Sequence, residues 1–191
     1  MCSRRCAQEN TMRYVSVLAI ALAVVITLSA PALAFARGPT IVDTALAVNG
    51  ETGEFSILIA ALEAEEELIE RLSARGQYTV FAPTDAAFTA LFVELAGDGA
   101  TEEQINKVAQ DILDNPALLS AVLSYHVAPG VRQANAVTRA NRINTLSGEF
   151  LRVSGAELTD AQGREAEIVN VDIRTSNGVI HVIDRVVLPM I

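Results

Sequence analysis

The chain has 191 residues, of which 51% are hydrophobic and 19% charged, so it can bury one sizeable core and is not a disordered protein. Its formal net charge is −9, and beyond residue 13 the balance is 11 basic against 22 acidic residues, or −11. Such a surface repels phosphate backbones, which argues against nucleic-acid partners. Because the two cysteines, Cys2 and Cys6, lie at the start, we expect neither disulfides nor thiol chemistry in the folded domain.

The first 36 residues have the pattern of a secretory signal peptide. A polar stretch with three arginines precedes an apolar run over residues 14–30, and small-residue cleavage sites end at Ala34 and Ala36. We expect cleavage after one of these two residues and a single domain over 37–191. The alternative is a retained membrane anchor, because the apolar run is long for a signal peptide and short for a membrane span.

This leader predicts a secreted protein, extracellular or periplasmic, that meets a membrane only if the leader stays uncleaved. Met1 and Met12 are both compatible with the true start, since Met12-Arg13 alone would give a compact basic segment before the apolar run.

Helical signals dominate the first half of the expected domain. The residues from Thr40 to Val48 indicate a short amphipathic helix. A helical stripe then runs from Phe55 to Leu72, and its slip at Glu65-Glu66-Glu67 predicts two helices that meet at an angle. Further helix starts are indicated by capping residues and by a proline at a first helical position. They predict helices over 86–91, from Thr101 with Gln104 to about Leu113, and from Pro116 to a turn at Pro129-Gly130.

Strand signals follow in the second half. A short β-type run at Tyr78–Ala82 stands among the helices, and later runs are expected at 150–153, 168–171 and 179–188. Asn177-Gly178 predicts a tight hairpin turn, because both central residues of such a turn prefer positive φ. Helices first and hairpin strands later indicate the α+β class.

Three segments of this chain resemble, in order, the motifs of the fasciclin family. They are Tyr78-Thr79-Val80-Phe81-Ala82-Pro83-Thr84-Asp85-Ala86-Ala87-Phe88, then Tyr125-His126-Val127 with Pro129-Gly130, and finally Ser176 to Asp184 ending in Leu188-Pro189. The resemblance spans residues 40–189. It implies a fasciclin-like fold, a β-wedge of mainly antiparallel strands with helices packed on it.

The resemblance also implies a secreted or cell-surface interaction module for cell adhesion or for binding an extracellular matrix or biofilm. The implied partners are a cell-surface or matrix protein or a polysaccharide. In animal adhesion members the tyrosine-histidine motif and an Asp-Ile pair have been implicated in receptor binding, and the matching residues here are Tyr125, His126, Asp172 and Ile173. The alternation Val169, Val171, Ile173 would place Asp172 on the opposite, exposed face of its strand.

The remaining motif residues are interpreted as structural. Thr84 and Asp85 suit a helix start, the two histidines His126 and His181 are expected to order nearby backbone, and Asp184 is expected to pair with an arginine. The full set is Phe81, Pro83, Thr84, Asp85, Phe88, Asn177, Gly178, His181 and Asp184.

No catalytic pattern stands out, so we expect neither an enzyme nor a metal or other cofactor. A zinc site needs more ligands than two histidines can supply. The alternative function is an extracellular carrier of an apolar small molecule, a lipid or carotenoid. The resemblance implies it, because some fasciclin-type proteins of photosynthetic organisms hold apolar pigments, and the helical half here is rich in Ala, Leu and Val.

Overall fold

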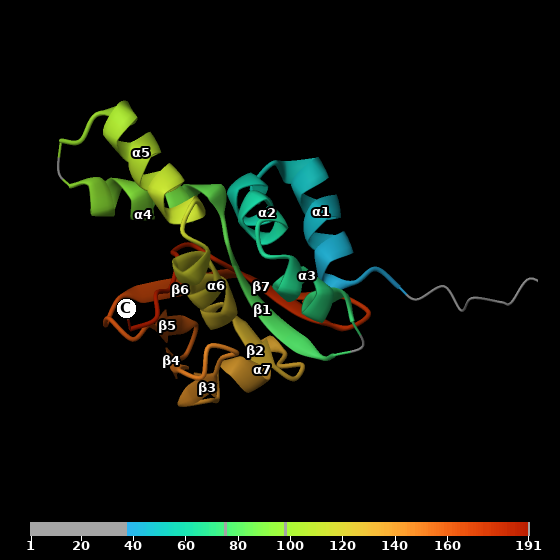
Figure 1. Cartoon of the computed structure of the whole chain (residues 1–191). Coiled ribbons are helices and arrows are strands. Elements are labelled where there is room, and N and C mark those ends of the chain that lie inside the picture. The colour runs from blue at the N-terminus through green and yellow to red at the C-terminus, as the bar shows by residue number, and fades with distance from the viewer. Residues whose placement is uncertain (1–37, 75, 98, 191) are drawn as a thin grey trace, which may run out of the picture. The chain divides into compact units, whose positions relative to one another are not determined.

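The helices of the first half and the strands of the second half pack together around the segments that carry the three motifs (Figure 1). The structure is a computed structural model that describes residues 38–190 apart from 75 and 98, so the expected leader and its cleavage sites lie outside the described residues. The α+β class is confirmed. The elements are α1 Ile41–Thr52, α2 Ser56–Glu63, α3 Glu66–Ser73, β1 Tyr78–Pro83, α4 Asp85–Ala96, α5 Glu102–Leu113, α6 Pro116–Tyr125, β2 Val127–Pro129, α7 Ala134–Val137, β3 Arg142–Asn144, β4 Phe150–Ser154, β5 Glu157–Thr159, β6 Glu165–Arg174 and β7 Gly178–Ile183.

Helix starts are set by local side chains, as the sequence predicts. The Thr101 side chain accepts a bond from the Gln104 backbone and Gln104 returns one, which completes the capping box of α5. Asn115 caps α6 with Pro116 at its first position, and the slip at Glu65 separates α2 from α3. These interactions join residues three positions apart, which is why sequence alone reveals them.

Several expected boundaries are wrong. Helix α4 continues to Ala96 rather than ending at residue 91, and α6 gives way to strand β2 before the expected turn at Pro129-Gly130. Strand β7 ends at Ile183, so the apolar residues to Leu188 form a buried irregular tail instead of a longer strand. The apolar run correctly predicted that these residues are buried, but it does not show that they form a strand. Buried backbone needs no partner strand where side chains hydrogen-bond to it.

The seven strands form one curled sheet in the order β2-β1-β7-β6-β5-β4-β3. The central strands β1 and β7 are parallel, and every other neighbouring pair is antiparallel. The backbone N–H of Leu146, just after β3, donates to the carbonyl of Val127 in β2 at 2.7 Å. The two edges of the sheet are thereby brought together.

The central strands are buried on both faces. Val80 and Ile180 face the helices, while Phe81 and Ile183 face the inside of the curled sheet. Helices α1 to α3 lie together beside β1 and β7, whereas α4 and α5 extend away from them (Figure 1). No helix in residues 38–190, the gaps at 75 and 98 aside, is long and apolar enough to cross a bilayer.

Asp85 caps a helix other than its own. It opens α4, whose N-cap Thr84 accepts a bond from the Ala87 N–H at 3.3 Å. The Asp85 carboxylate instead accepts bonds from the backbone N–H groups of Ser56 and Ile57, at 3.1 and 2.8 Å. Those groups begin α2, whose own N-cap residue makes no side-chain bond, so Asp85 joins two helices.

Asn177-Gly178 does close the β6–β7 hairpin, but neither residue takes the expected positive φ. The Asn177 side chain accepts from the N–H of Ile41 at 2.9 Å and donates to the carbonyls of Leu72 and Ala74. Gly178 lies against β1, where a Cβ atom would stand 2.2 Å from the Tyr78 carbonyl oxygen. Both residues are therefore required by close packing rather than by turn geometry.

We predict that Gly178→Ala lowers the free energy of unfolding by about 2–3 kcal/mol, because the new methyl group must displace backbone of β1. The matched control is Gly50→Ala, in helix α1, where a Cβ meets nothing within 4 Å. It should leave stability unchanged or raise it by up to about 1 kcal/mol. Urea unfolding of both variants measures the difference, and equal stabilities would contradict the packing account.

Candidate functional site

The sheet brings the motif segments side by side. Tyr125-His126 leads directly into β2, the first motif forms β1, the last forms β7, and Asp172-Ile173 ends β6. Val80 of β1 is in register with Val127 on one side and Ile180 on the other, and Ile180 is in register with Ile173. Segments that are far apart in the sequence are thus neighbouring strands of the sheet.

His126 is buried, with 2% of its surface exposed. Its Nδ1 lies 2.7 Å from the carbonyl of Val122, and its Nε2 accepts the backbone N–H of Val187 at 3.3 Å. The neutral ring protonated at Nδ1 satisfies both contacts. Burial lowers the pKa of His126 to about 4, against which the Val122 bond acts weakly. The ring joins the end of α6 to the C-terminal tail.

Tyr125 is wholly buried in the core inside the curled sheet. Its hydroxyl donates to the carbonyl of Phe150 at 3.2 Å. Burial raises its pKa to about 12, so the phenol stays protonated. Tyr125 therefore anchors α6 to β4.

Asp172 lies at an irregular point of β6 and has φ 59°, the one left-handed non-glycine residue among those described. Its carboxylate accepts the N–H of Ala134 at 2.8 Å, which starts α7. The expectation of a simple alternation was wrong, because two register shifts interrupt β6 and leave Val169 and Val171 exposed. Ile173 packs partly buried beside the helices.

His181 lies beside Asp172 on the neighbouring strand. Its Nδ1 accepts the Asp172 N–H at 3.3 Å, and its Nε2 lies 2.8 Å from the carbonyl of Arg132. The ring is fully buried and stacks on Phe81 with 5.8 Å between centroids. It fixes the loop before α7 against β7, as expected of a histidine that orders backbone.

The four residues expected to bind a partner do not form one exposed patch, because Tyr125 and His126 are buried and Asp172 and Ile173 are half-buried. A binding role for them stays a prediction. Asp184 accepts the N–H of Glu167 at 2.7 Å and forms no ion pair with any described residue, in place of the expected arginine contact. The other structural motif residues Phe81, Pro83 and Phe88 are buried.

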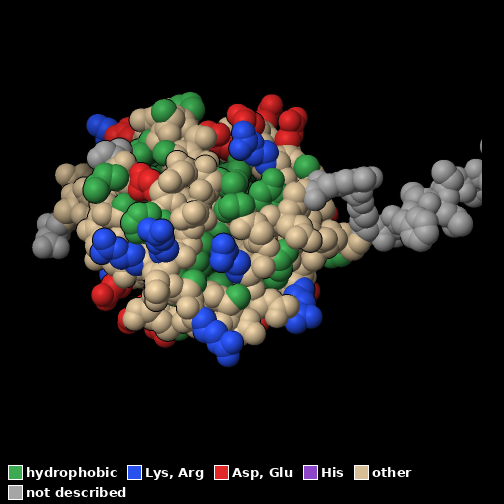
Figure 2. Space-filling view, turned by 90° about the horizontal axis from the view of Figure 1, so that it is seen from below, with side chains coloured by type: hydrophobic (Ala, Val, Ile, Leu, Met, Phe, Trp, Pro, Cys, Tyr) green, Lys and Arg blue, Asp and Glu red, His purple; other side chains and the backbone are tan. Residues whose placement is uncertain are grey.

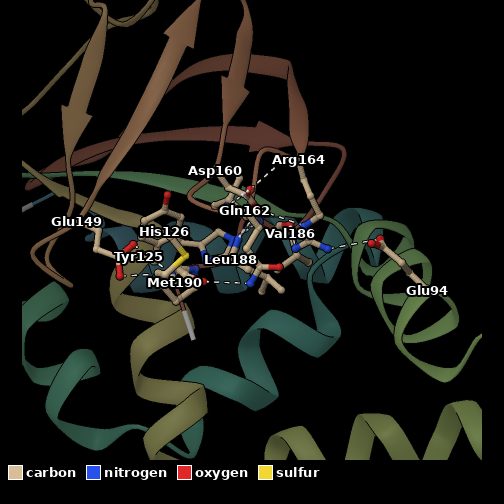
Figure 3. A network of polar contacts seen from close by, with 12 residues as sticks. Glu94, Tyr125, His126, Glu149, Asp160, Gln162, Arg164, Val186, Leu188 and Met190 are labelled. Carbon is tan, nitrogen blue, oxygen red and sulfur yellow. Dashed lines mark hydrogen bonds and ion pairs between the residues drawn. The ribbon is translucent and has the colours of Figure 1, made fainter.

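A polar network that the sequence did not indicate holds the C-terminal tail (Figure 3). Asp160, 5% exposed, accepts the N–H of Leu188 at 2.9 Å and the Arg164 side chain at 3.2 Å. Arg164 also donates to the carbonyl of Val186 at 3.1 Å and pairs with Glu94 at 3.4 Å. Asp160 and Arg164 are four residues apart, but their other partners lie more than twenty residues away in the sequence, so local patterns do not reveal the network.

The helical half holds an apolar pocket of about 230 Å³ between α2, α4, α5 and α6. Helix α5 has no buried residue, although Ile105, Val108 and Ile112 line its apolar stripe, so it covers this region loosely. In the part of the chain that the structure describes, no three His, Cys, Asp or Glu side chains gather closely enough to hold a metal ion.

We predict that stability falls as the pH is lowered from 6.5 towards 4. The unfolded chain binds a proton at the usual histidine pKa of about 6.5, whereas folded His126 resists protonation until about pH 4. The loss from this residue reaches about 2 kcal/mol at pH 5. Urea unfolding at pH 7.5 and 5 measures it. His126→Gln should be less stable at pH 7.5 yet lose less on acidification, and an undiminished loss would contradict the assignment.

Comparison with known proteins agrees with the motifs. The model of the fasciclin domain matches residues 53–189. Protein sll1483 of Synechocystis is 39% identical over 150 residues, which cover 78% of this chain and 73% of that protein. Cell surface glycolipoprotein MPB83 of Mycobacterium bovis is 34% identical over 134 residues, 70% of this chain and 53% of that protein.

Two further similarities concern larger proteins. Transforming growth factor-beta-induced protein ig-h3 of Sus scrofa is 33% identical over 71% of this chain, which spans only 18% of that protein. The solved FAS1 domain pair of the insect cell adhesion molecule fasciclin I shares the fold, with a TM-score of 0.55 at 15% identity, over 78% of this chain and 51% of that one. The chain described here belongs to the fasciclin domain family.

Proposed function

We propose that this protein is a secreted or cell-surface interaction module that supports adhesion or matrix binding and carries out no catalysis. Two similar proteins are named a cell surface glycolipoprotein and a cell adhesion molecule, which supports this general kind of function. The expected leader supports export.

The observation that carries the proposal is where the reactive side chains of the motifs are directed. Both ring nitrogens of His126 and of His181 are within bonding distance of backbone groups, and the Asp85 and Asp172 carboxylates accept backbone N–H groups. A general base or nucleophile must instead reach a substrate. These side chains maintain the fold, and the exposed surface is left for recognition.

The expected single domain would impose a condition on adhesion. One binding surface cannot bridge two bodies unless the protein is attached at another point or associates with itself. An uncleaved leader would supply the attachment, and a cleaved one would leave a protein that coats a matrix.

The test is to delete the gene and to measure attachment of the host cells to a solid surface. We expect attachment to fall several-fold, the protein to be found in the extracellular or envelope fraction, and Gly50→Ala to restore attachment as well as the unaltered gene. A protein confined to the cytosolic fraction, or unchanged attachment, would refute the proposal.

A second candidate, the apolar carrier, is favoured by the pocket between α2, α4, α5 and α6. Its 230 Å³ exceeds a 150 Å³ protein cavity that binds benzene but is below the usual range of about 300–1,000 Å³ for ligand pockets. It therefore suits a ring or part of an acyl chain, and a whole carotenoid would require α5 to move.

If the carrier proposal holds, native mass spectrometry of protein purified from its own host detects a stoichiometric apolar ligand. Ala61→Leu fills this pocket, since Ala61 lines it and is 1% exposed, and should abolish the ligand mass. A ligand-free native protein, or a ligand retained by Ala61→Leu, would exclude carriage in this pocket.

A further inference from the structure

Basic residues are concentrated in one part of this acidic chain. Residues 126–191 hold seven arginines and seven acidic residues, whereas residues 38–125 hold three basic and fifteen acidic residues. From Asn115 to Gly148 the chain has no Asp or Glu at all. Viewed from the side of β3 and α7, Lys and Arg side chains spread over the face, and most acidic side chains stand near its rim (Figure 2).

Strands β3 and β4 place two of these arginines directly opposite each other. Arg142 is in register with Arg152, and Asn144 with Phe150. The residues between them, Ile143 and Leu151, are fully buried, so alternation directs the other four outward. We call the exposed set Arg142, Asn144, Phe150 and Arg152 the arginine face.

Two arginines directly opposite each other destabilise the sheet unless an anionic group lies near them. Residues directly opposite on antiparallel strands have Cβ atoms about 5 Å apart, and like charges there repel. Neither arginine forms an ion pair with any residue of the described chain. The Arg142 guanidinium carbon lies 5.6 Å from the centre of the Phe150 ring, which holds one cation over an exposed aromatic side chain.

A groove of about 590 Å³ runs beside Phe150 and Arg152. Two acidic residues line it: Glu149 accepts the N–H of Met190, and Asp160 accepts that of Leu188 and forms an ion pair with Arg164. The acidic residues on the outer face of the sheet lie on β5 and β6: one is opposite Ser154 and diagonal to Arg152, and two lie on the strand after β5. They are Glu157, Glu165 and Glu167.

We infer that the arginine face and this groove bind an acidic polysaccharide whose sugars carry carboxylates. Guanidinium groups bind carboxylates through paired hydrogen bonds, and an exposed aromatic ring can stack on the C–H face of a sugar. The groove extends the contact beyond a single ion, as a polymer requires. The acidic remainder of the chain repels any polyanion, and it repels duplex nucleic acid strongly because that polymer carries one charge per about 1.7 Å. The inference names a partner class for the proposed interaction module and rests on that function.

The test measures binding of labelled polygalacturonate to the full native protein at low salt. The double variant Arg142→Gln/Arg152→Gln should weaken binding at least tenfold, and Phe150→Ala about threefold or more. The control pair Arg174→Gln/Arg185→Gln makes the same charge change at exposed arginines outside this face and should stay within twofold. Thermal unfolding within a few degrees of the unaltered protein establishes that each variant is folded.

Three outcomes would overturn the inference: no binding of polygalacturonate by the unaltered protein, equal losses in both arginine pairs, or polyglutamate bound as tightly, which would indicate an acidic protein partner. The attachment assay separates this inference from the proposed function. If deletion abolishes attachment but the Arg142→Gln/Arg152→Gln gene restores it fully, binding through the arginine face is refuted and the proposed adhesion function is retained. If polygalacturonate binding depends on the face but deletion leaves attachment unchanged, the surface stands and the adhesion role fails.

Discussion

The parallel pairing of β1 with β7 is the constraint on which the rest of the fold depends. It joins a segment near the start of the domain to one near its end, in register from Tyr78 with Gly178 to Pro83 with Ile183. One face of this pair supports the helical core and the other the core inside the curled sheet. Because the long loop between the strands must close first, neither core can form completely before both motifs are in place.

Sequence patterns succeeded where the controlling contacts are local. The caps at Thr101 and Asn115 and the slip at Glu65 join residues a few positions apart, and all three were predicted. Strands β3 and β5 were missed, since three residues show no period, and their pairing is set by β4 between them. The position of Asp172 was predicted wrongly because a strand bulge depends on the partner strand, which periodicity does not show.

Hydrogen bonding to buried backbone explains why the motifs, and the segment around Asp160 outside them, contain residue types that also occur in active sites. Asn177, His126 and Asp160 each bind backbone groups that regular structure leaves unpaired. An unpaired buried backbone group costs about 1–3 kcal/mol, so each of these side chains permits an irregular segment to stay buried. The tail from Asp184 to Met190 is the clearest example, since it has no strand partner yet most of it is buried. Histidine and aspartate are used there for their hydrogen-bonding geometry rather than for proton transfer.

The contrast between buried motif side chains and outward-facing strand residues indicates which surface is free to recognise a partner. Once the motif side chains are committed to the interior, only the outward positions can vary the surface without disturbing the fold. On β3 and β4 those positions hold two opposed arginines, which repel each other and form no ion pair with any described residue. The repulsion between the two guanidinium groups favours binding of an anion. A carboxylate bound between them would form charge-assisted hydrogen bonds with both and remove that repulsion. The acidic helical half then repels that same anion, so a polysaccharide would approach the domain from the side of the sheet.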